Sequence, residues 1–344
     1  MSYLQRVAEA YGDITFSSDE LAYYARHLLL PSVGTVGQQK LKAARVLVLG
    51  AGGLGCPVLQ ALAGAGVGML TVVDGDVVSI SNVSRQWLHT VAEQGTNKAN
   101  SAAGSLSELN PYIAVTSVAE MLTEGNAGEL IAAHDLVVDA TDDLEVRYLI
   151  DSVCAELDRP WVHAALYRDS SQICVFWDRC GARFADLFPE RGDAPSCAGA
   201  GMLGAAASVA ANLQALEVIK LITGNGRPKV GEVVSIHTGS LQLQSFRMQG
   251  VAQPEQFAEL ASGAFAMTVD DLLQERSIGA SIEELDVRAG VAETILERGL
   301  PESGASKIVL ICEEGLVSGL LAEALRRRGY EQVYHLEGGY QEYS

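Results

Sequence analysis

Positive charge is scarce in this sequence of 344 residues, which has 24 Lys and Arg against 43 Asp and Glu. The resulting net charge is −19, and no segment is rich in Lys or Arg. Binding to a nucleic-acid backbone needs a basic face that neutralises phosphates, and an acidic chain without such a segment does not provide one. We therefore do not expect a nucleic-acid partner.

Cysteine is also sparse, because the chain has only six, widely scattered. This number is too small for a disulfide scaffold, and in a reducing compartment most of the thiols should be buried as small apolar side chains. The first 20 residues lack the charged and apolar regions of a secretory signal. Apolar stretches such as 201–211 consist of small residues and are too short to span a membrane. We expect a cytoplasmic protein without a membrane partner.

The length leaves room for one large and one small domain, since single cores stop growing near roughly 250 to 300 residues. Two α/β patterns are separated by a polar segment that contains Gly and Pro. We predict a first domain over 1–248, a linker over 249–264 and a second domain over 265–344.

Residues 45–74 read RVLVLGAGGLGCPVLQALAGAGVGMLTVVD, and the first domain is organised around them. An apolar run leads into four glycines, an apolar helical segment follows, and a second run ends on Asp74. A strand, tight turn, helix and strand in this order place a phosphate on N–H groups at a helix N-terminus. Asp74 lies 19 residues beyond the last glycine, about where such folds bind a ribose hydroxyl. The glycines are Gly50, Gly52, Gly53 and Gly55.

A polar loop over 75–86 follows Asp74 directly. Ligands in open α/β sheets bind beyond the carboxyl ends of strands, so nucleotide contacts are expected in this loop. Lys98, near the start of the next expected helix, is either a solvated charge or a cation for leaving pyrophosphate. The binding candidates within the loop are Asp76, Ser81, Asn82, Arg85 and Gln86.

The segment DLVVDATDDLEVR over 135–147 predicts a buried parallel strand at 136–140, followed by Asp142 and Asp143. Mg²⁺ prefers one or two carboxylates plus nucleotide phosphates, so this pair suits a magnesium ion. An aspartate at this point can also cap the helix that follows. Both roles are compatible.

Two cysteines stand where a loop meets an expected helix. Cys197 precedes a long helix, and amide dipoles there can lower a thiol pKa, although a buried structural cysteine is the simpler interpretation. Cys312 directly follows an expected strand at 307–311, in a geometry that stabilises a thiolate or persulfide. The carboxylates of Glu313 and Glu314 oppose that stabilisation.

With these residues laid out, the chain resembles the ThiF/MoeB/HesA family, bacterial relatives of ubiquitin-activating enzymes, over about 17–247. The implied fold class is α/β, with a Rossmann-like adenylation domain of the ubiquitin-activating type. The tail resembles a small, shortened α/β rhodanese-like domain, as in molybdopterin-synthase adenylyltransferase/sulfurtransferase fusions. The first resemblance rests on YARH at 24–27, GAGGLG at 50–55, Asp74 with Asp76, SNVSRQ at 81–86, Lys98, ATDD at 140–143 with Arg147, LFPE at 187–190 and SCAGAGMLG at 196–204. The second rests on LDVR at 285–288, residues 307–318, Gly329 with Tyr330 and LEGGY at 336–340.

The resemblance implies that the substrate is a small ubiquitin-like sulfur carrier ending in Gly-Gly. The carrier carboxylate would attack the α-phosphate of Mg·ATP to give an acyl-adenylate and pyrophosphate, ahead of thiocarboxylate formation. It assigns Asp74 to the ribose, Gly53 to close backbone approach and Asp142 to Mg²⁺. The phosphates are assigned to Asn82, Arg85, Gln86 and Lys98.

The resemblance further implies a homodimer in which Arg26 reaches the nucleotide of the other subunit, although the apolar pattern around Arg26 also fits a solvated arginine. The cysteine that matches Cys197 can hold the carrier covalently in this family. Cys312 would carry persulfide sulfur, supplied by a donor of the cysteine-desulfurase type.

The chain departs from the family at its usual zinc site, which is held by two Cys-x-x-Cys pairs. Arg183 and Asp186 occupy the places of one pair, and no cysteine lies between Cys197 and Cys312. Tetrahedral thiolate zinc needs four ligands in reach, so we predict no zinc site. In the tail, Val317 stands where an arginine is common. A docking module is therefore the alternative to an active sulfurtransferase.

Two other functions remain as hypotheses. An NAD-dependent oxidoreductase would account for the glycines and Asp74, but not for the 81–86 loop or the aspartate pair. A binding scaffold would hold the carrier without any chemistry.

Overall fold

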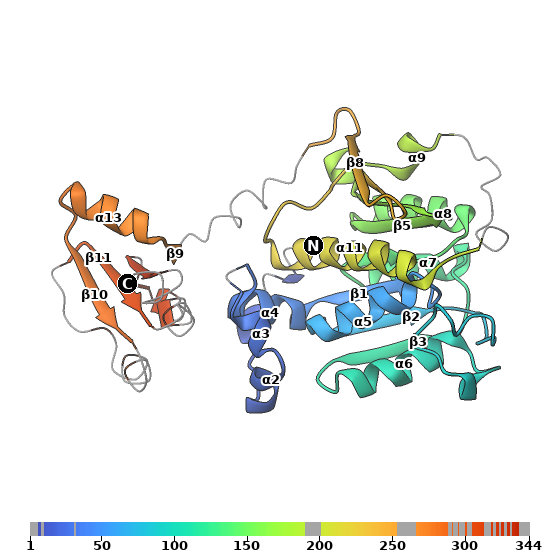
Figure 1. Ribbon diagram of the computed structural model, residues 1–344, viewed down its shortest axis with the longest axis horizontal. Helices are drawn as coiled ribbons and strands as arrows, with labels where there is room; N and C mark the ends of the chain where they lie inside the picture. The colour runs from blue at the N-terminus through green and yellow to red at the C-terminus, as the bar shows by residue number, and fades with distance from the viewer. Residues whose placement is uncertain are drawn as a thin grey trace. The chain divides into compact units, whose positions relative to one another are not determined.

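The computed structural model describes most of the chain. The described residues are 6–7, 10–30, 32–189, 201–252, 266–287, 291, 295, 300, 305–312, 318, 321–322, 325–326, 329–330 and 332–336. The chain divides into one unit of residues 1–24 and 36–259 and a second of residues 25–35 and 260–344 (Figure 1). Each unit has its own sheet.

The sheet of the first unit has the strand order β3-β2-β1-β4-β5-β6-β7-β8. Neighbouring strands from β3 through β5 are parallel, and β5 through β8 pair antiparallel. The order reverses between β1 and β4, which is the switch point where doubly wound folds bind ligands. The strands are β1 (Arg45–Leu49), β2 (Met69–Val73), β3 (Ala114–Val118), β4 (Leu136–Asp139), β5 (Trp161–Tyr167), β6 (Ser170–Phe176), β7 (Glu232–His237) and β8 (Gln242–Arg247).

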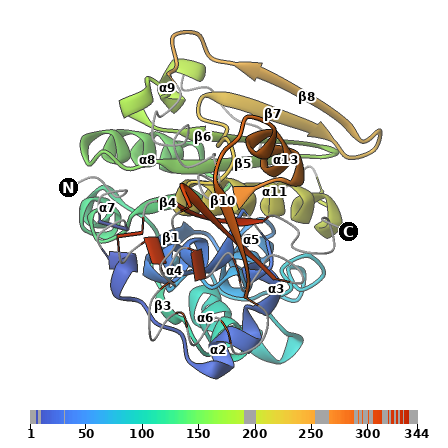
Figure 2. The same ribbon diagram turned by 90° about the vertical axis from the view of Figure 1, so that its left-hand side faces the viewer.

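Helices cover both faces of this sheet, as the continuous apolar runs of β1 and β4 require. Helices α5 and α11 pack together on one face with α6, and α7 packs on α8 over the other. Figure 2 shows α7 and α8 to the left of β1 and β4, with α5 and α11 to the right. The helical segments before the second sheet are η1 (Tyr11–Asp13), α2 (Ser18–Tyr23), α3 (Ala25–Leu28), α4 (Gly34–Ala43), α5 (Gly55–Ala65), η2 (Val91–Glu93), α6 (Lys98–Leu109), α7 (Glu124–Ala132), α8 (Leu144–Glu156), η3 (Asp178–Cys180), α9 (Phe184–Leu187) and α11 (Gly204–Thr223).

Helix α11 is long and apolar enough to cross a membrane by length and composition alone. Its contacts with α5, β5 and β6 explain the apolar composition, because its small side chains lie against the sheet. Buried alanines such as Ala207, Ala210 and Ala211 permit this close approach. Helix α11 is therefore a core helix of the first unit.

The second unit contains a parallel sheet in the order β10-β11-β12-β9. The central strand β11 is buried on both sides, with Leu310 in one apolar cluster and Val309 and Ile311 in another. Helix α13 begins with a capping box between Thr268 and Asp271. The elements are β9 (Ala266–Met267), α13 (Val269–Ser277), β10 (Ile282–Asp286), β11 (Lys307–Ile311) and β12 (Val333–Leu336).

The polar segment after Arg179 is not purely a loop, because it contains the short helix α9. Phe184 on α9 is buried and packs edge-on against Phe176, which gives the segment an apolar anchor. The buried carboxylate of Asp151 accepts hydrogen bonds from the backbone N–H groups of Phe184 (2.9 Å) and Ala185 (3.4 Å), and so caps the helix.

Candidate nucleotide-binding site

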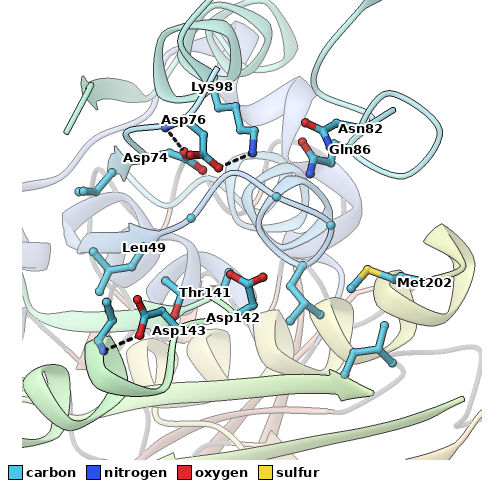
Figure 3. A pocket seen from close by; sticks show the side chains of 18 of the residues that line it. Leu49, Asp74, Asp76, Asn82, Gln86, Lys98, Thr141, Asp142, Asp143 and Met202 are labelled. Atoms are coloured by element: carbon cyan, nitrogen blue, oxygen red, sulfur yellow. Dashed lines mark hydrogen bonds and ion pairs between the residues drawn. The ribbon is translucent and has the colours of Figure 1, made fainter. Parts of the chain in front are cut away.

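A cavity of about 700 Å³ opens at the carboxyl ends of β1, β2 and β4, beside the switch point (Figure 3). Most of the side chains singled out in the sequence come together here. The lining includes Gly50, Gly52, Gly53, Asp74, Asp76, Ser81, Asn82, Arg85, Gln86, Lys98, Asp142, Asp143 and Arg147, with Met202 at one side.

The glycine turn between β1 and α5 has no room for side chains. Gly50 has a φ of +96°, and a Cβ there would lie 2.8 Å from the carbonyl oxygen of Ala140. A Cβ on Gly55 would lie 2.0 Å from the carbonyl oxygen of Gly50. Gly55 does not line the cavity. Because it has no side chain, α5 can begin at this residue, directly against the backbone of the turn. Gly53 does face the cavity, where a Cβ would meet the Sδ of Met202 at 2.8 Å.

Asp74 ties the glycine turn to the end of β2. Its Oδ2 accepts a hydrogen bond from the backbone N–H of Ala51 (2.8 Å), and its Oδ1 accepts one from the N–H of Asp76 (2.9 Å). Each carboxylate oxygen can accept a further hydrogen bond, and the side chain borders the cavity. This buried carboxylate is therefore fixed in place for a donor such as a ribose hydroxyl.

Lys98 is the first residue of α6, and its ammonium group is held against the cavity wall. Its Nζ lies 2.9 Å from Oδ2 of Asp76, and its backbone N–H donates to the carbonyl of Asp76 (2.9 Å). Asn97 caps the helix and donates its amide to the carbonyls of Asp74 and Asp76. Figure 3 shows the contacts among Lys98, Asp76 and Asp74 along one wall.

The 81–86 loop supplies polar groups to the opposite side of the turn. Arg85 donates from Nη1 to the carbonyl of Ser81 (2.8 Å), which leaves most of its guanidinium donors for a ligand. The side chain of Gln86 is buried, and its Oε1 has no hydrogen-bond partner among the described residues. Gly204, at the start of α11, approaches this loop so closely that a Cβ would lie 3.0 Å from Cζ2 of Trp87.

The two adjacent aspartates have different surroundings. Asp143 is the N-cap of α8, with its Oδ1 accepting hydrogen bonds from the N–H groups of Glu145 (2.9 Å) and Val146 (3.4 Å). Asp142 is exposed to the cavity and makes no hydrogen bond within the described part of the chain. One carboxylate thus stabilises the helix, and the other is available to a ligand.

Sequence reasoning missed Asp139, the buried carboxylate behind this aspartate pair. Its Oδ1 accepts hydrogen bonds from the backbone N–H (3.0 Å) and hydroxyl (2.7 Å) of Thr141. Its Oδ2 accepts from Nε of Arg147 (3.1 Å) and Nδ1 of His163 (2.9 Å). Arg147 also donates to the carbonyl of Thr141 (2.7 Å), so the segment that carries Asp142 is held from two sides.

Two opposing effects set the ionisation of this buried group. Burial raises the pKa of Asp139, but the Arg147 guanidinium and the hydrogen bond from His163 together outweigh burial, and the pKa lies below its ordinary value. Burial lowers the pKa of His163, which favours a neutral ring that donates from Nδ1. An aspartate at the very end of a buried strand, eight residues before an arginine, was the available signal for this pair.

The other predicted residues lie elsewhere. Arg26 is exposed on α3, which is grouped with the second unit. Cys197 falls outside the described residues. Cys312 is buried in the second unit at the end of β11, and its Sγ accepts a hydrogen bond from the N–H of Ser318 (3.3 Å). The Oγ of Ser318 is also 3.3 Å from that sulfur.

Arg183, at one of the two positions where the family resemblance implies a zinc-binding cysteine, forms an ion pair. Its Nε lies 3.0 Å from Oδ2 of Asp151 and its Nη1 lies 3.3 Å from Oδ1 of Asp178. Within the described residues, no group of three or more His, Cys, Asp and Glu side chains is placed to hold a metal.

The doubly wound sheet, its glycine turn and a cavity lined by cations and carboxylates define a nucleotide-binding α/β domain. The chain belongs to the ThiF family, whose family model matches residues 24–256. Residues 272–344 match the rhodanese-like domain.

Curated relatives match either nearly the whole of this chain or about two thirds of it. The probable adenylyltransferase/sulfurtransferase MoeZ of Mycobacterium tuberculosis is 35% identical over 363 aligned residues, which cover 94% of this chain and 92% of that protein. The sulfur carrier protein adenylyltransferase of Thermus thermophilus is 41% identical over 64% of this chain and 84% of its own length. The molybdopterin-synthase adenylyltransferase of Escherichia coli is 39% identical over 67% and 94%.

Solved structures share the fold at lower identity. E. coli MccB with ATP has a TM-score of 0.56 and 22% identity, over 70% of this chain and 73% of that one. Selenomethionine PaaA has a TM-score of 0.60 and 22% identity, over 67% and 74%. These likenesses support the α/β adenylation fold expected from the sequence.

Proposed function

We propose that this chain adenylates the C-terminal Gly-Gly carboxylate of a small ubiquitin-like sulfur carrier, using ATP and releasing pyrophosphate. The observation that carries the proposal is the convergence of the glycine turn, Arg85, Lys98 and Asp142 on one cavity in a ThiF-family chain. Relatives that are named sulfur carrier protein adenylyltransferase and molybdopterin-synthase adenylyltransferase support the choice of substrate.

The chemistry requires two anions, the carrier carboxylate and the α-phosphate of ATP, to meet. Asp74 would hold the ribose, and backbone N–H groups of the glycine turn would receive phosphate oxygens. Arg85 and Lys98 would stabilise charge that develops on the pyrophosphate. Because these groups are already positioned by neighbouring hydrogen bonds, catalysis would come mainly from orientation and electrostatics.

The charge balance of the cavity favours a bound metal ion. Lys98 is paired with Asp76, and Arg147 is paired with Asp139, which leaves Arg85 without a carboxylate partner among the described residues. The cavity lining nevertheless holds four carboxylates (Asp74, Asp76, Asp142 and Asp143) against three cations (Arg85, Lys98 and Arg147), and a nucleoside triphosphate adds more negative charge. Asp142 is the group that would hold Mg²⁺, which when bound would screen phosphate charge.

We also propose a homodimer, in which Arg26 acts on the nucleotide of the other subunit, and a cytoplasmic location. A donor of the cysteine-desulfurase type would supply sulfur for the thiocarboxylate. The basis for the dimer is the resemblance of the YARH motif at 24–27 to that of the ThiF/MoeB/HesA family. The rhodanese-like match supports sulfur delivery within the same chain.

The adenylation proposal is tested by isotope exchange between pyrophosphate and ATP with the full chain. Exchange is expected only when ATP, Mg²⁺ and a Gly-Gly carrier are all present, because reversal needs the acyl-adenylate. A carrier that lacks its last glycine is the matched control. Binding of NAD in place of ATP would instead support the oxidoreductase hypothesis, and carrier binding without exchange would support the scaffold.

Activity of Cys312 forms a separate prediction. Its sulfur already accepts one N–H hydrogen bond, which would stabilise a thiolate or the inner sulfur of a persulfide. Full chain incubated with thiosulfate and cyanide should therefore form thiocyanate, and Cys312→Ala should lower the rate by at least about tenfold. Cys180→Ala, which removes a buried thiol of the first unit, should retain the rate. A wild-type chain that forms no thiocyanate would identify the tail as a docking module.

A further inference from the structure

His89 is buried behind the glycine turn, with 2% of its surface exposed, and the residues assigned above to catalysis do not include it. Its Nε2 lies 2.9 Å from the carbonyl oxygen of Ala51, which is the second residue of the turn. A carbonyl oxygen can only accept a hydrogen bond, so Nε2 must carry a proton. The other ring nitrogen, Nδ1, lies 2.8 Å from Oγ of Ser101 on α6.

The hydroxyl of Ser101 determines the state of that second nitrogen. The same Oγ is 2.8 Å from Oε1 of Glu93 and has one proton to donate. Burial raises the pKa of Glu93, but hydrogen bonds from Thr90 and Ser101 outweigh burial and lower the pKa overall, so the carboxylate is ionised at neutral pH. An ionised carboxylate only accepts, so the Ser101 proton points to Glu93, and Oγ is left to accept from Nδ1–H of His89.

We propose that His89 is held as a buried imidazolium by Glu93 through Ser101, and that it acts as a positioning residue for the nucleotide turn. The proton chain runs from Nε2–H of His89 to the Ala51 carbonyl, and from Nδ1–H through the Ser101 hydroxyl to Glu93. This series of hydrogen bonds ends on an acceptor at both sides, the Ala51 carbonyl and the Glu93 carboxylate. The inference rests on the proposed function only in its choice of ATP as the ligand.

The consequence for ligand binding follows from the peptide that joins Ala51 and Gly52. A cationic donor on the Ala51 carbonyl polarises this amide and makes the N–H of Gly52 a stronger donor, because linked hydrogen bonds reinforce one another. Gly52 lines the cavity. On its other side, Ala51 donates its own N–H to Asp74. Ala51 is therefore held by two charged groups, because its carbonyl accepts from the His89 cation and its N–H donates to the Asp74 carboxylate.

The charged and titratable neighbours are consistent with this state. From α5, the Cys56 thiol lies 3.7 Å from Nε2 of His89 and donates to the same Ala51 carbonyl at 3.3 Å. Burial raises the pKa of Cys56 to about 12, so it remains a neutral thiol. Within the described part of the chain, the charged groups near this site include Glu93, Asp74 at the end of β2, and Lys98 at the start of α6.

The proton count is tested by ¹⁵N NMR of the histidine ring in the full chain at pH 7, without nucleotide. Both ring nitrogens of His89 should show the shifts of protonated imidazolium nitrogens. Ser101→Ala should convert the ring to the neutral Nε2–H form, whereas Ser107→Ala, an exposed serine of the same helix, should not. A neutral ring in the wild-type chain would overturn the inference, whatever the enzyme does.

The positioning role is tested by calorimetric titration with ATP and Mg²⁺ in the absence of carrier. His89→Gln keeps a neutral donor for the Ala51 carbonyl, and the Kd for ATP should rise about tenfold, the difference between a charged and a neutral hydrogen bond. The KM for the carrier should remain within about twofold, as for Ser107→Ala.

Equal ATP affinity in wild type and His89→Gln would overturn the inference, while a wild type that binds no ATP would overturn the proposed function.

Discussion

Replacing Asp142 with alanine is expected to lower carrier-dependent exchange of pyrophosphate into ATP by about 10²-fold or more, a loss typical of one preorganised electrostatic group. Asp142 is exposed to the cavity, whereas the neighbouring carboxylate of Asp143 caps α8. Without Asp142, the metal ion would be held by phosphate oxygens and water alone. The rate of exchange at saturating ATP and carrier is the measurement.

The magnesium dependence separates a metal role from a structural one. The Asp142→Ala enzyme should need more Mg²⁺ to reach half of its own maximal rate, because a ligand to the ion has been removed. Glu145→Gln removes an exposed charge of the same sign three residues further on, outside the cavity lining, and serves as the matched control. Exchange that survives Asp142→Ala unchanged, with the same Mg²⁺ dependence, would contradict the assignment of Asp142 to the metal ion.

The largest loss of stability is expected from Asp139→Ala, at about 3–5 kcal/mol of the free energy of unfolding. This carboxylate is fully buried and compensates the charge of Arg147, whose side chain is mostly buried as well. Its removal leaves that guanidinium unpaired and the donors of Thr141 without their acceptor. Urea unfolding followed by the fluorescence of Trp161 and Trp177 would report this, because both are buried in the first unit.

The pH dependence of that stability has a definite sign. The pKa of Asp139 is lower in the folded protein than its ordinary value, so the carboxylate stabilises the fold at neutral pH. This contribution is lost as pH falls through the folded-state pKa. Asp139→Ala should therefore flatten the acid side of the stability profile, and Thr141→Val, which removes one hydroxyl donor, should cost only about 1–2 kcal/mol. A loss below about 1 kcal/mol for Asp139→Ala would contradict a stabilising role.

The parts of the fold that the sequence predicted depend on local patterns. The run before Gly50 forms β1, the run ending at Asp74 forms β2, and the polar 81–86 loop borders the cavity, because glycines, apolar runs and polar loops mark strand ends directly. The expected strands near 136–140 and 307–311 are β4 and β11. Each of these elements could be located without knowing any distant partner.

The missed features depend on partners far apart in the chain. Asp139 is hydrogen-bonded to His163, and His89 is hydrogen-bonded to Ala51 and Ser101. Only folding brings these partners within reach of one another. Strand β9 has two residues, and its pairing with β12 defines it as a strand. Arg26 and Cys197 were assigned by resemblance, so their roles stay predictions.

The position of Trp87 makes the protein its own optical probe. The residue is 50% exposed and directly follows Gln86 of the cavity wall, whereas the other two tryptophans of the sequence are buried. A ligand that contacts the 81–86 loop would change the polarity around one indole and leave a constant emission background from the core. Entry of nucleotide could then be timed by stopped-flow mixing, with no label attached to either molecule.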